Sequence, residues 1–290
     1  MSLISILISL AIESYWEQVD KLRQYGWFET YRNWMMEKLQ GLPLYDSPLG
    51  VVLVLGPLAF AVWLVDAMLG GVLSLFSFLF GIAVLIFCFG PRALSRDAQA
   101  YLSAAESGDH EQAMQYASEI LGRPVDEQPQ QLAQLVKDAI LIHANDRLVA
   151  VMFWFALLGP VGAVIFRAST LLKDETVLLP DKFSHSVHDL FWVMNWIPAR
   201  LCIIGYALAG NFIDTVSYWR SVNDFWIRDS DDLLVTSGNG ALRQDMRIDM
   251  AEDGKELFIH GVAHAMSLVK RTVIVFLALL AILTLAGWLI

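Results

Sequence analysis

The chain is poor in charged side chains and has no excess of positive charge. Asp, Glu, Lys and Arg make up 17% of its 290 residues, whereas soluble domains contain about 25%. The 30 acidic residues outnumber the 20 basic ones, so the formal net charge is −10. A nucleic-acid-binding surface needs clustered Lys and Arg. The charge balance therefore excludes DNA and RNA as partners.

Cysteine is nearly absent as well, and the sequence has no phosphate-binding loop. Cys88 and Cys202 each lie inside an apolar run with no second cysteine nearby. This spacing excludes a disulfide framework and a thiolate metal cluster, and we expect both side chains to pack as small apolar groups. The run 237–240 contains two glycines but lacks the strand-to-helix context of a phosphate loop, so we predict a flexible turn there. We expect no cofactor.

The sequence is instead rich in apolar residues, and these are unevenly distributed. Hydrophobic residues make up 56% of the chain, and the mean hydropathy is +0.51. Residues 47–91 contain a single ionisable side chain, Asp66, whereas residues 91–147 have the composition of ordinary polar helices. This segregation is typical of a membrane protein with helices outside the bilayer.

Four apolar runs are long enough to cross a membrane as helices. Each contains 19 residues, or about 28 Å at helical rise, and they lie at residues 51–69, 72–90, 148–166 and 272–290. We predict that Gly70 and Gly71 form the turn of a hairpin between the first two. We also predict a kink at Gly159 and Pro160 in the third.

Residues 190–213 are ambiguous, because this largely apolar segment contains Asn195, Pro198 and Arg200. If it crosses the membrane, 16 of the 20 basic residues share one side, as cytoplasmic loops do, and the N-terminus is cytoplasmic. An arginine at mid-membrane argues for four crossings unless it faces the bundle interior or water. The predicted fold is therefore an all-α polytopic membrane protein with four to five transmembrane helices plus interfacial and cytoplasmic helices.

Six segments follow from this pattern. Residues 1–12 are apolar but have no basic residue before them and no small-residue cleavage site after them, so we expect them to stay on the protein. The aromatic and charged residues that follow suit either a helix at the lipid headgroups or one packed on the protein. The segments are N-terminal apolar and interfacial helices (1–46), a transmembrane hairpin (47–91), a cytoplasmic helical block (92–147), the third span with a core motif (148–213), a polar helical segment (214–269) and a C-terminal transmembrane helix (270–290).

Charged residues in or beside apolar segments are the candidate ligand-binding groups. Asp138 and Asp146 precede the third span, Arg167 follows it, and Arg200 lies in the ambiguous segment. Arginines in such surroundings must be paired or solvated, so they are either partners in buried ion pairs or ligands for an anion.

Two further groups are weaker candidates for metal sites. His260 and His264 are four residues apart and share a helix face, but no carboxylate accompanies them at the spacing of a metalloprotease. The acidic run 229–232 could hold a divalent cation. We favour a solvated turn that caps a helix.

The segments 145–163, 166–168 and 195–201 carry a family likeness. The last reads Asn-Trp-Ile-Pro-Ala-Arg-Leu. Together they resemble the membrane superfamily of the cobalamin-biosynthesis proteins CbiB and CobD, over roughly residues 96–214. The pattern is degenerate: Ile142 and His143 replace a Glu-Asn pair, and residues 170–173 replace Asn-Thr-Leu-Asp. These changes remove groups that a ligase-type site needs, and the remaining pattern resembles the AmpE branch of the superfamily.

The resemblance implies a multi-pass protein of the bacterial inner membrane that acts as a regulator or sensor in β-lactamase induction and cell-wall stress, without catalysis. Besides the lipid bilayer, we expect a protein partner or a small cell-wall-derived ligand at segments 92–147 and 214–269, and a homo-oligomer remains open. The alternative is a membrane enzyme or small-ligand-binding protein with a modified cobalamin-type site. Solute transport ranks third, because a transporter would need a continuous path and a pair of broken helices, and the sequence shows only one Gly-Pro break.

Overall fold

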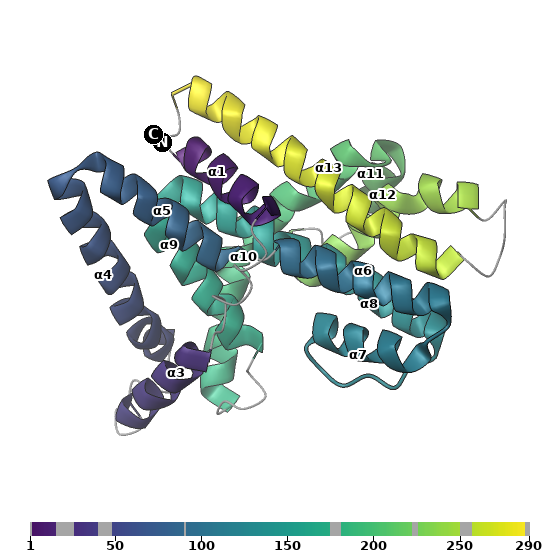
Figure 1. The fold of residues 1–290 in the computed structure, drawn as a ribbon, viewed down its shortest axis with the longest axis horizontal. Helices are drawn as coiled ribbons and strands as arrows, with labels where there is room; N and C mark the ends of the chain where they lie inside the picture. The colour runs from purple at the N-terminus through teal and green to yellow at the C-terminus, as the bar shows by residue number, and fades with distance from the viewer. Residues whose placement is uncertain are drawn as a thin grey trace. The chain divides into compact units, whose positions relative to one another are not determined.

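The computed structural model describes residues 2–15, 26–39, 48–89, 91–174, 181–221, 226–249 and 257–287. Every regular element within these ranges is a helix, which confirms the predicted all-α class (Figure 1). Four of these helices are long and apolar enough to cross a membrane: Leu49–Gly71, Pro129–Asp174, Lys182–Ala209 and His260–Leu285. The chain is a multi-pass membrane protein.

The helices form two compact units. Unit 1 comprises Met1–Phe89, Ala150–Asn195 and Ala281–Ile290, and unit 2 comprises Gly90–Val149 and Trp196–Leu280. The chain passes between the units within α10 (Asp181–Ala209) and α13 (Leu257–Leu285). Each unit buries apolar side chains of its own, such as Phe28 and Leu172 in unit 1 and Ile140 and Leu234 in unit 2.

Unit 1 contains four helices from the first third of the chain together with α9: α1 (Ser2–Tyr15), α3 (Gly26–Leu39), α4 (Pro48–Val72), α5 (Ser74–Cys88) and α9 (Ala150–Asp174). Helix α5 contacts α1, α4 and α9, and α1 and α5 lie side by side in Figure 1. Helix α3 packs against α4, where the Tyr31 hydroxyl donates to the backbone oxygen of Val54 at 2.7 Å. Phe28 is buried while Trp27 and Trp34 are exposed. The helix therefore has one protein-facing side, and the predicted aromatic segment is partly packed on the protein.

The hairpin between α4 and α5 differs in detail from the prediction. Helix α4 continues through Gly70 and Gly71, and the break falls at Leu73, which has an extended backbone (φ −154°, ψ 130°). Glycine permits a helix break without imposing one. Ser77 joins the two arms by donating to Asp66 Oδ1 at 2.6 Å. Helix α5 has only 15 residues, about 22 Å at helical rise, so it is shorter than the predicted span.

The kink in α9 is confirmed. Gly159 leaves the helical region with φ 66° and ψ −152°, and Pro160 follows it. Proline lacks the N–H that would continue the hydrogen-bond ladder, and glycine alone tolerates this φ without strain. The bend brings Gly162 so close to the backbone oxygen of Trp154 that no Cβ would fit there. Two adjacent residues in the sequence thus set the path of this span.

Unit 2 contains the polar helical block and the helices that follow the membrane segments: α6 (Pro91–Ser107), α7 (His110–Leu121), α8 (Pro129–Ala144), the π-helix η1 (Asn145–Val149), α11 (Phe212–Ser221) and α12 (Ser230–Asp249). Helix α7 packs on α6 and α8, and α12 packs on α8 and α11. Helix α7 is capped at both ends, because Asp109 accepts the Gln112 N–H at 3.1 Å and Gly122 follows the helix with φ 67°.

The prediction of a flexible turn at residues 237–240 is wrong. The run lies inside α12 and is not a turn. A Cβ at Gly238 would lie 2.6 Å from Leu141 Cδ1 in α8, and one at Gly240 would lie 3.3 Å from Thr215 Cα in α11. Close packing of α12 against α8 and α11 therefore explains the two glycines. The sequence pattern of the run alone does not show whether its glycines allow a flexible turn or a close helix contact.

Candidate functional site

The four predicted ligand residues do not share one unit. Asp138 in α8, Asp146 in η1 and Arg200 in α10 belong to unit 2, whereas Arg167 in α9 belongs to unit 1. Arg167 Nη1 donates to Thr170 Oγ1, one turn further along the same helix, at 3.4 Å. Each of the three residues in unit 2 has hydrogen-bond partners of its own.

Arg200 is buried, with 6% of its surface exposed, and holds the segment that leads into α12. Nη1 donates to the backbone oxygen of Trp196 at 3.2 Å and to Ser230 Oγ at 2.9 Å. Nη2 donates to the backbone oxygens of Trp226 and Arg228, both at 3.3 Å. The four hydrogen bonds replace water around the guanidinium. These hydrogen bonds explain why an arginine is tolerated in the middle of an apolar helix, because they compensate for the water that the buried guanidinium loses.

Two tryptophans complete the surroundings of Arg200. The rings of Trp196 and Trp226 are stacked with centroids 5.8 Å apart, and Trp196 Nε1 donates to the backbone oxygen of Trp226 at 3.0 Å. The Arg200 guanidinium lies 4.8 Å from the centre of the Trp196 ring, within the range of a cation–π contact. We call Trp196, Arg200, Trp226 and Ser230 the arginine clamp. It joins α10 to the N-terminus of α12.

Asp146 lies in an unusual backbone segment. Residues Asn145–Val149 form a π-helix between α8 and α9, and π-helical turns occur often at functional sites. Asn145 and Asp146 are both buried, and Asn145 Nδ2 donates to Asp146 Oδ1 at 2.9 Å. One turn earlier, the backbone oxygen of Leu141 accepts the hydroxyl of Tyr206 in α10 at 2.6 Å. The π-helix thus carries a buried carboxylate next to a polar contact with α10.

Asp138 forms the centre of a second polar group. Its two carboxylate oxygens accept from Gln134 Nε2 at 3.1 and 3.0 Å, and Oδ1 also accepts from Asn239 Nδ2 in α12 at 3.3 Å. Asn239 Oδ1 is buried and has no hydrogen-bond partner among the described residues. A buried amide oxygen without a donor is unfavourable, so such an atom marks a place where water or a ligand is expected.

Lys137 belongs to the same group. Only 4% of its surface is exposed, and its charge is close enough to that of Asp138 for the two to attract. The Lys137 stem packs beside Gly261 of α13, where an added Cβ would lie in ordinary van der Waals contact, 3.6 Å from Lys137 Cδ. We call Gln134, Lys137, Asp138 and Asn239 the polar cluster. It combines an ammonium group, a carboxylate and amides, which suits recognition of a small polar ligand.

The sequence interpretation missed Lys137 and Asn239. A signal for Lys137 was present, because it shares a helix face with Ala133, Ile140 and Leu141, which are all buried. A lysine at such a position is unusual. Asn239 gave no comparable signal, since it lies between two glycines in the run interpreted as a turn.

The described residues contain no group of three or more His, Cys, Asp or Glu side chains that could hold a metal ion. His260 is exposed and His264 is half-buried, both near the start of α13. Within the acidic run 229–232, Asp232 Oδ2 lies 3.6 Å from Arg228 Nε, and Ser230 belongs to the arginine clamp. The sequence predicts no metal site, and the histidine pair stays a weak candidate for one.

Comparison with known families matches residues 1–290 to the family described as the regulatory signalling modulator protein AmpE. The chain is also similar to the cobalamin biosynthesis protein CobD of Chromobacterium violaceum, at 27% identity over 199 residues, which covers 66% of this chain and 61% of the relative. CobD of Stutzerimonas stutzeri is 24% identical over 72% of this chain and 66% of its own length. Protein AmpE of Shigella flexneri is 23% identical over 71% of this chain and 72% of its own length.

The matches to the two CobD relatives thus span less than two thirds of each relative's length. No solved structure matches the chain. The family match, in contrast, extends from the first residue to the last. The chain belongs to the AmpE family of regulatory signalling modulators.

Proposed function

We propose that this protein is a regulator in the bacterial inner membrane that takes part in β-lactamase induction under cell-wall stress, without catalysis. The observation that carries this proposal is the family match over the entire chain. The predicted gathering of basic residues on one side supports a cytoplasmic N-terminus. In this orientation the helical block 92–147 is exposed to the cytoplasm.

The polar cluster is the proposed sensing site, and a small cell-wall-derived ligand is the proposed occupant. Asn239 Oδ1 requires a donor, Asp138 accepts further hydrogen bonds, and Lys137 can pair with an anionic group. A ligand with both an amine or amide N–H and a carboxylate satisfies all three. Asp146 acts in the same proposal as a positioning residue, because its π-helix continues directly from α8, which carries the cluster. Arg200 maintains the position of α12 through the arginine clamp. Arg167 in unit 1 stays a separate ligand-binding prediction.

Asp138→Asn and Asp146→Asn should each reduce β-lactam-induced β-lactamase expression about tenfold or more, at unchanged protein level. For Asp138 the reason is that a lost charged hydrogen bond to the ligand lowers its affinity by roughly this factor. For Asp146 the reason is that the hydrogen bond from Asn145 loses its charged acceptor, so the π-helix beside α8 is held less firmly. The assay is a β-lactamase reporter in a deletion strain complemented with each variant. Glu111→Gln is the matched control, since it makes the same change on an exposed position of α7. Normal induction by both aspartate variants would refute the site.

The CobD relatives favour one second candidate, a membrane enzyme with a modified cobalamin-type site. The Asn-Trp-Ile-Pro-Ala-Arg-Leu segment that carries this likeness contains Trp196 and Arg200, whose described contacts hold α12. Expression of the wild-type protein in a strain that lacks CobD should therefore not restore cobalamin-dependent growth, whereas a CobD control should. Growth of the strain with this protein would establish the enzymatic alternative.

A further inference from the structure

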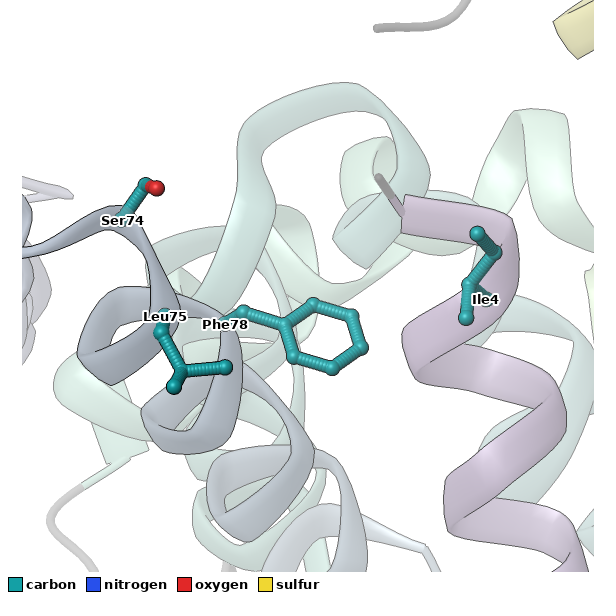
Figure 2. A pocket seen from close by; sticks show the side chains of 4 residues that line it. All are labelled: Ile4, Ser74, Leu75 and Phe78. Atoms are coloured by element: carbon teal, nitrogen blue, oxygen red, sulfur yellow. The ribbon is translucent and has the colours of Figure 1, made fainter.

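An apolar cavity lies between α1 and α5 in unit 1. It has a volume of about 300 Å³ and is lined by Ile4, Ser74, Leu75 and Phe78. Figure 2 shows the Phe78 ring extending from α5 toward α1, with Ile4 across the gap and Ser74 at the beginning of α5. Ser74 supplies the only hydroxyl among these four lining residues. The cavity is therefore suited to an apolar ligand with any polar end near Ser74.

The cavity is closed at one end by a contact between the two helices. Ser9 Oγ lies 3.4 Å from the backbone oxygen of Ile82 and donates to Ser5 in its own helix at 2.7 Å. Ser9 follows Ile4 by five residues and Ile82 follows Phe78 by four, so α1 and α5 run parallel here. Ser9 and Ile6 are fully buried. An occupant must therefore enter from the end at Ser74 or from the open side.

The open side is continuous with an exposed apolar surface of α5, which we expect to face lipid. Leu75, Phe76 and Leu79 of α5 are exposed, and α5 follows α4, which is long and apolar enough to span the bilayer. The short connection at Leu73 places Ser74 at the end of a span, near the lipid headgroups. The rest of the lining lies deeper, where acyl chains are the surrounding solvent.

The size of the cavity fits part of one lipid tail. At about 30 Å³ per molecule it would hold roughly ten waters, and a methylene group occupies a similar volume. Water is unfavourable in a cavity lined almost entirely by carbon. In the bilayer, a chain of about ten methylene groups is the available occupant of this composition.

We propose that the cavity between α1 and α5 is a binding site for one acyl chain of a membrane phospholipid, with its ester end near Ser74. This site is distinct from the polar cluster in unit 2 and does not depend on the proposed function. The bound chain fills the gap that α1 and α5 leave at their N-terminal ends and stabilises the position of α1.

The test uses the full-length protein in vesicles of phosphatidylethanolamine and phosphatidylglycerol, with a trace of phospholipid that carries a photoactivatable diazirine in its acyl chain. After irradiation, mass spectrometry maps the labelled residues. We expect labelling at Ile4, Leu75 and Phe78 to exceed that at Phe60 and Met68, which are exposed on α4 and lie outside the cavity. Equal labelling of both surfaces would mean ordinary lipid contact and would overturn the proposal.

A bulky side chain that fills the cavity should abolish the excess labelling of the cavity residues over the exposed residues of α4. Labelling of Phe78 should fall about tenfold in Ile4→Trp. The larger side chain should displace about two methylene groups of the acyl chain from the cavity, and the lost burial of two methylene groups weakens binding by about that factor. Leu7→Trp is the matched control, since Leu7 is exposed on the same helix but does not line the cavity. Ile4→Ala removes one wall without adding bulk and should also reduce labelling of Phe78 while α4 labelling stays constant. Unchanged labelling of Phe78 in either Ile4 variant contradicts the proposal.

Discussion

Arg200→Ala should lower the free energy of unfolding by about 3 kcal/mol and abolish induction with it. The variant removes four hydrogen bonds at once, to the backbone oxygens of Trp196, Trp226 and Arg228 and to Ser230 Oγ. The backbone oxygen of Trp226 keeps Trp196 Nε1 as a donor, whereas the buried Ser230 Oγ loses its donor, and a buried acceptor without a donor is unfavourable by roughly 1 to 3 kcal/mol. The Trp196 ring also loses its cation–π contact. We expect the segment before α12 to detach from α10, and the position of Asn239 in the polar cluster to be lost as a result.

The measurement is thermal unfolding in detergent, followed by circular dichroism. Arg200→Lys retains the charge, but a single ammonium group cannot reach acceptors arranged around a planar guanidinium, so it should recover only part of the stability. Ser230→Ala removes one of the four hydrogen bonds and should cost about 1 kcal/mol. If Arg200→Ala unfolds at the wild-type temperature, the arginine clamp does not hold α12. Arg200 would then regain its place as a candidate ligand for an anion.

Gly210→Ala should destabilise unit 2 by about 2 to 3 kcal/mol, as overpacking of a tight contact does. A Cβ at Gly210 would lie 2.7 Å from both the Cβ and the backbone oxygen of Ala241 in α12. The same oxygen accepts the Asn211 N–H at 2.9 Å. The neighbour is therefore backbone already held by a hydrogen bond, and it cannot rotate away as a side chain could.

The control for this substitution is Gly56→Ala, where no heavy atom lies within 4 Å of the added Cβ. Because alanine is the better helix former, this variant should be neutral or more stable by up to about 1 kcal/mol. Unfolding temperature and the yield of monodisperse protein are compared for both. In a Gly210→Ala/Ala241→Gly double variant the Cβ contact disappears but the contact with the oxygen remains, so recovery should be partial. Equal stability of the two single variants would contradict the packing argument.

Features with a local cause could be predicted from the sequence. The kink in α9 follows from the adjacent Gly159 and Pro160, and the start of α7 from Asp109 and Gln112. The long apolar runs indicated the membrane-spanning helices because hydropathy is summed over many residues. The ambiguous segment around Arg200 proved to lie in the 28-residue apolar helix Lys182–Ala209. By contrast, the second arm of the hairpin proved to be only 15 residues long. Residues 288–290 of the predicted C-terminal transmembrane helix and residues 16–25 of the N-terminal segment lie outside the described residues.

Features that depend on partners distant in the chain could not be predicted. The glycines of α12 were interpreted as a turn, because only the approach of Leu141 and Thr215 explains them. Asn239 meets Asp138 although they are 101 residues apart. Two of the Arg200 acceptors in the segment before α12 are backbone oxygens, which every residue has, so no residue type reveals them.

The sequence by itself determined that this is an acidic, all-helical membrane chain with few charges, and it identified Asp138, Asp146, Arg167 and Arg200 as the residues that need explanation. Composition and hydropathy suffice to identify the class of chain and these four residues, since it is unfavourable to remove a charged side chain from water at any place in a fold. Only the tertiary structure decided which acceptors surround Arg200, that Lys137 is buried and that Asn239 joins Asp138. These facts depend on how α8, α10, α12 and α13 pack within unit 2, and such contacts between distant segments leave no local pattern.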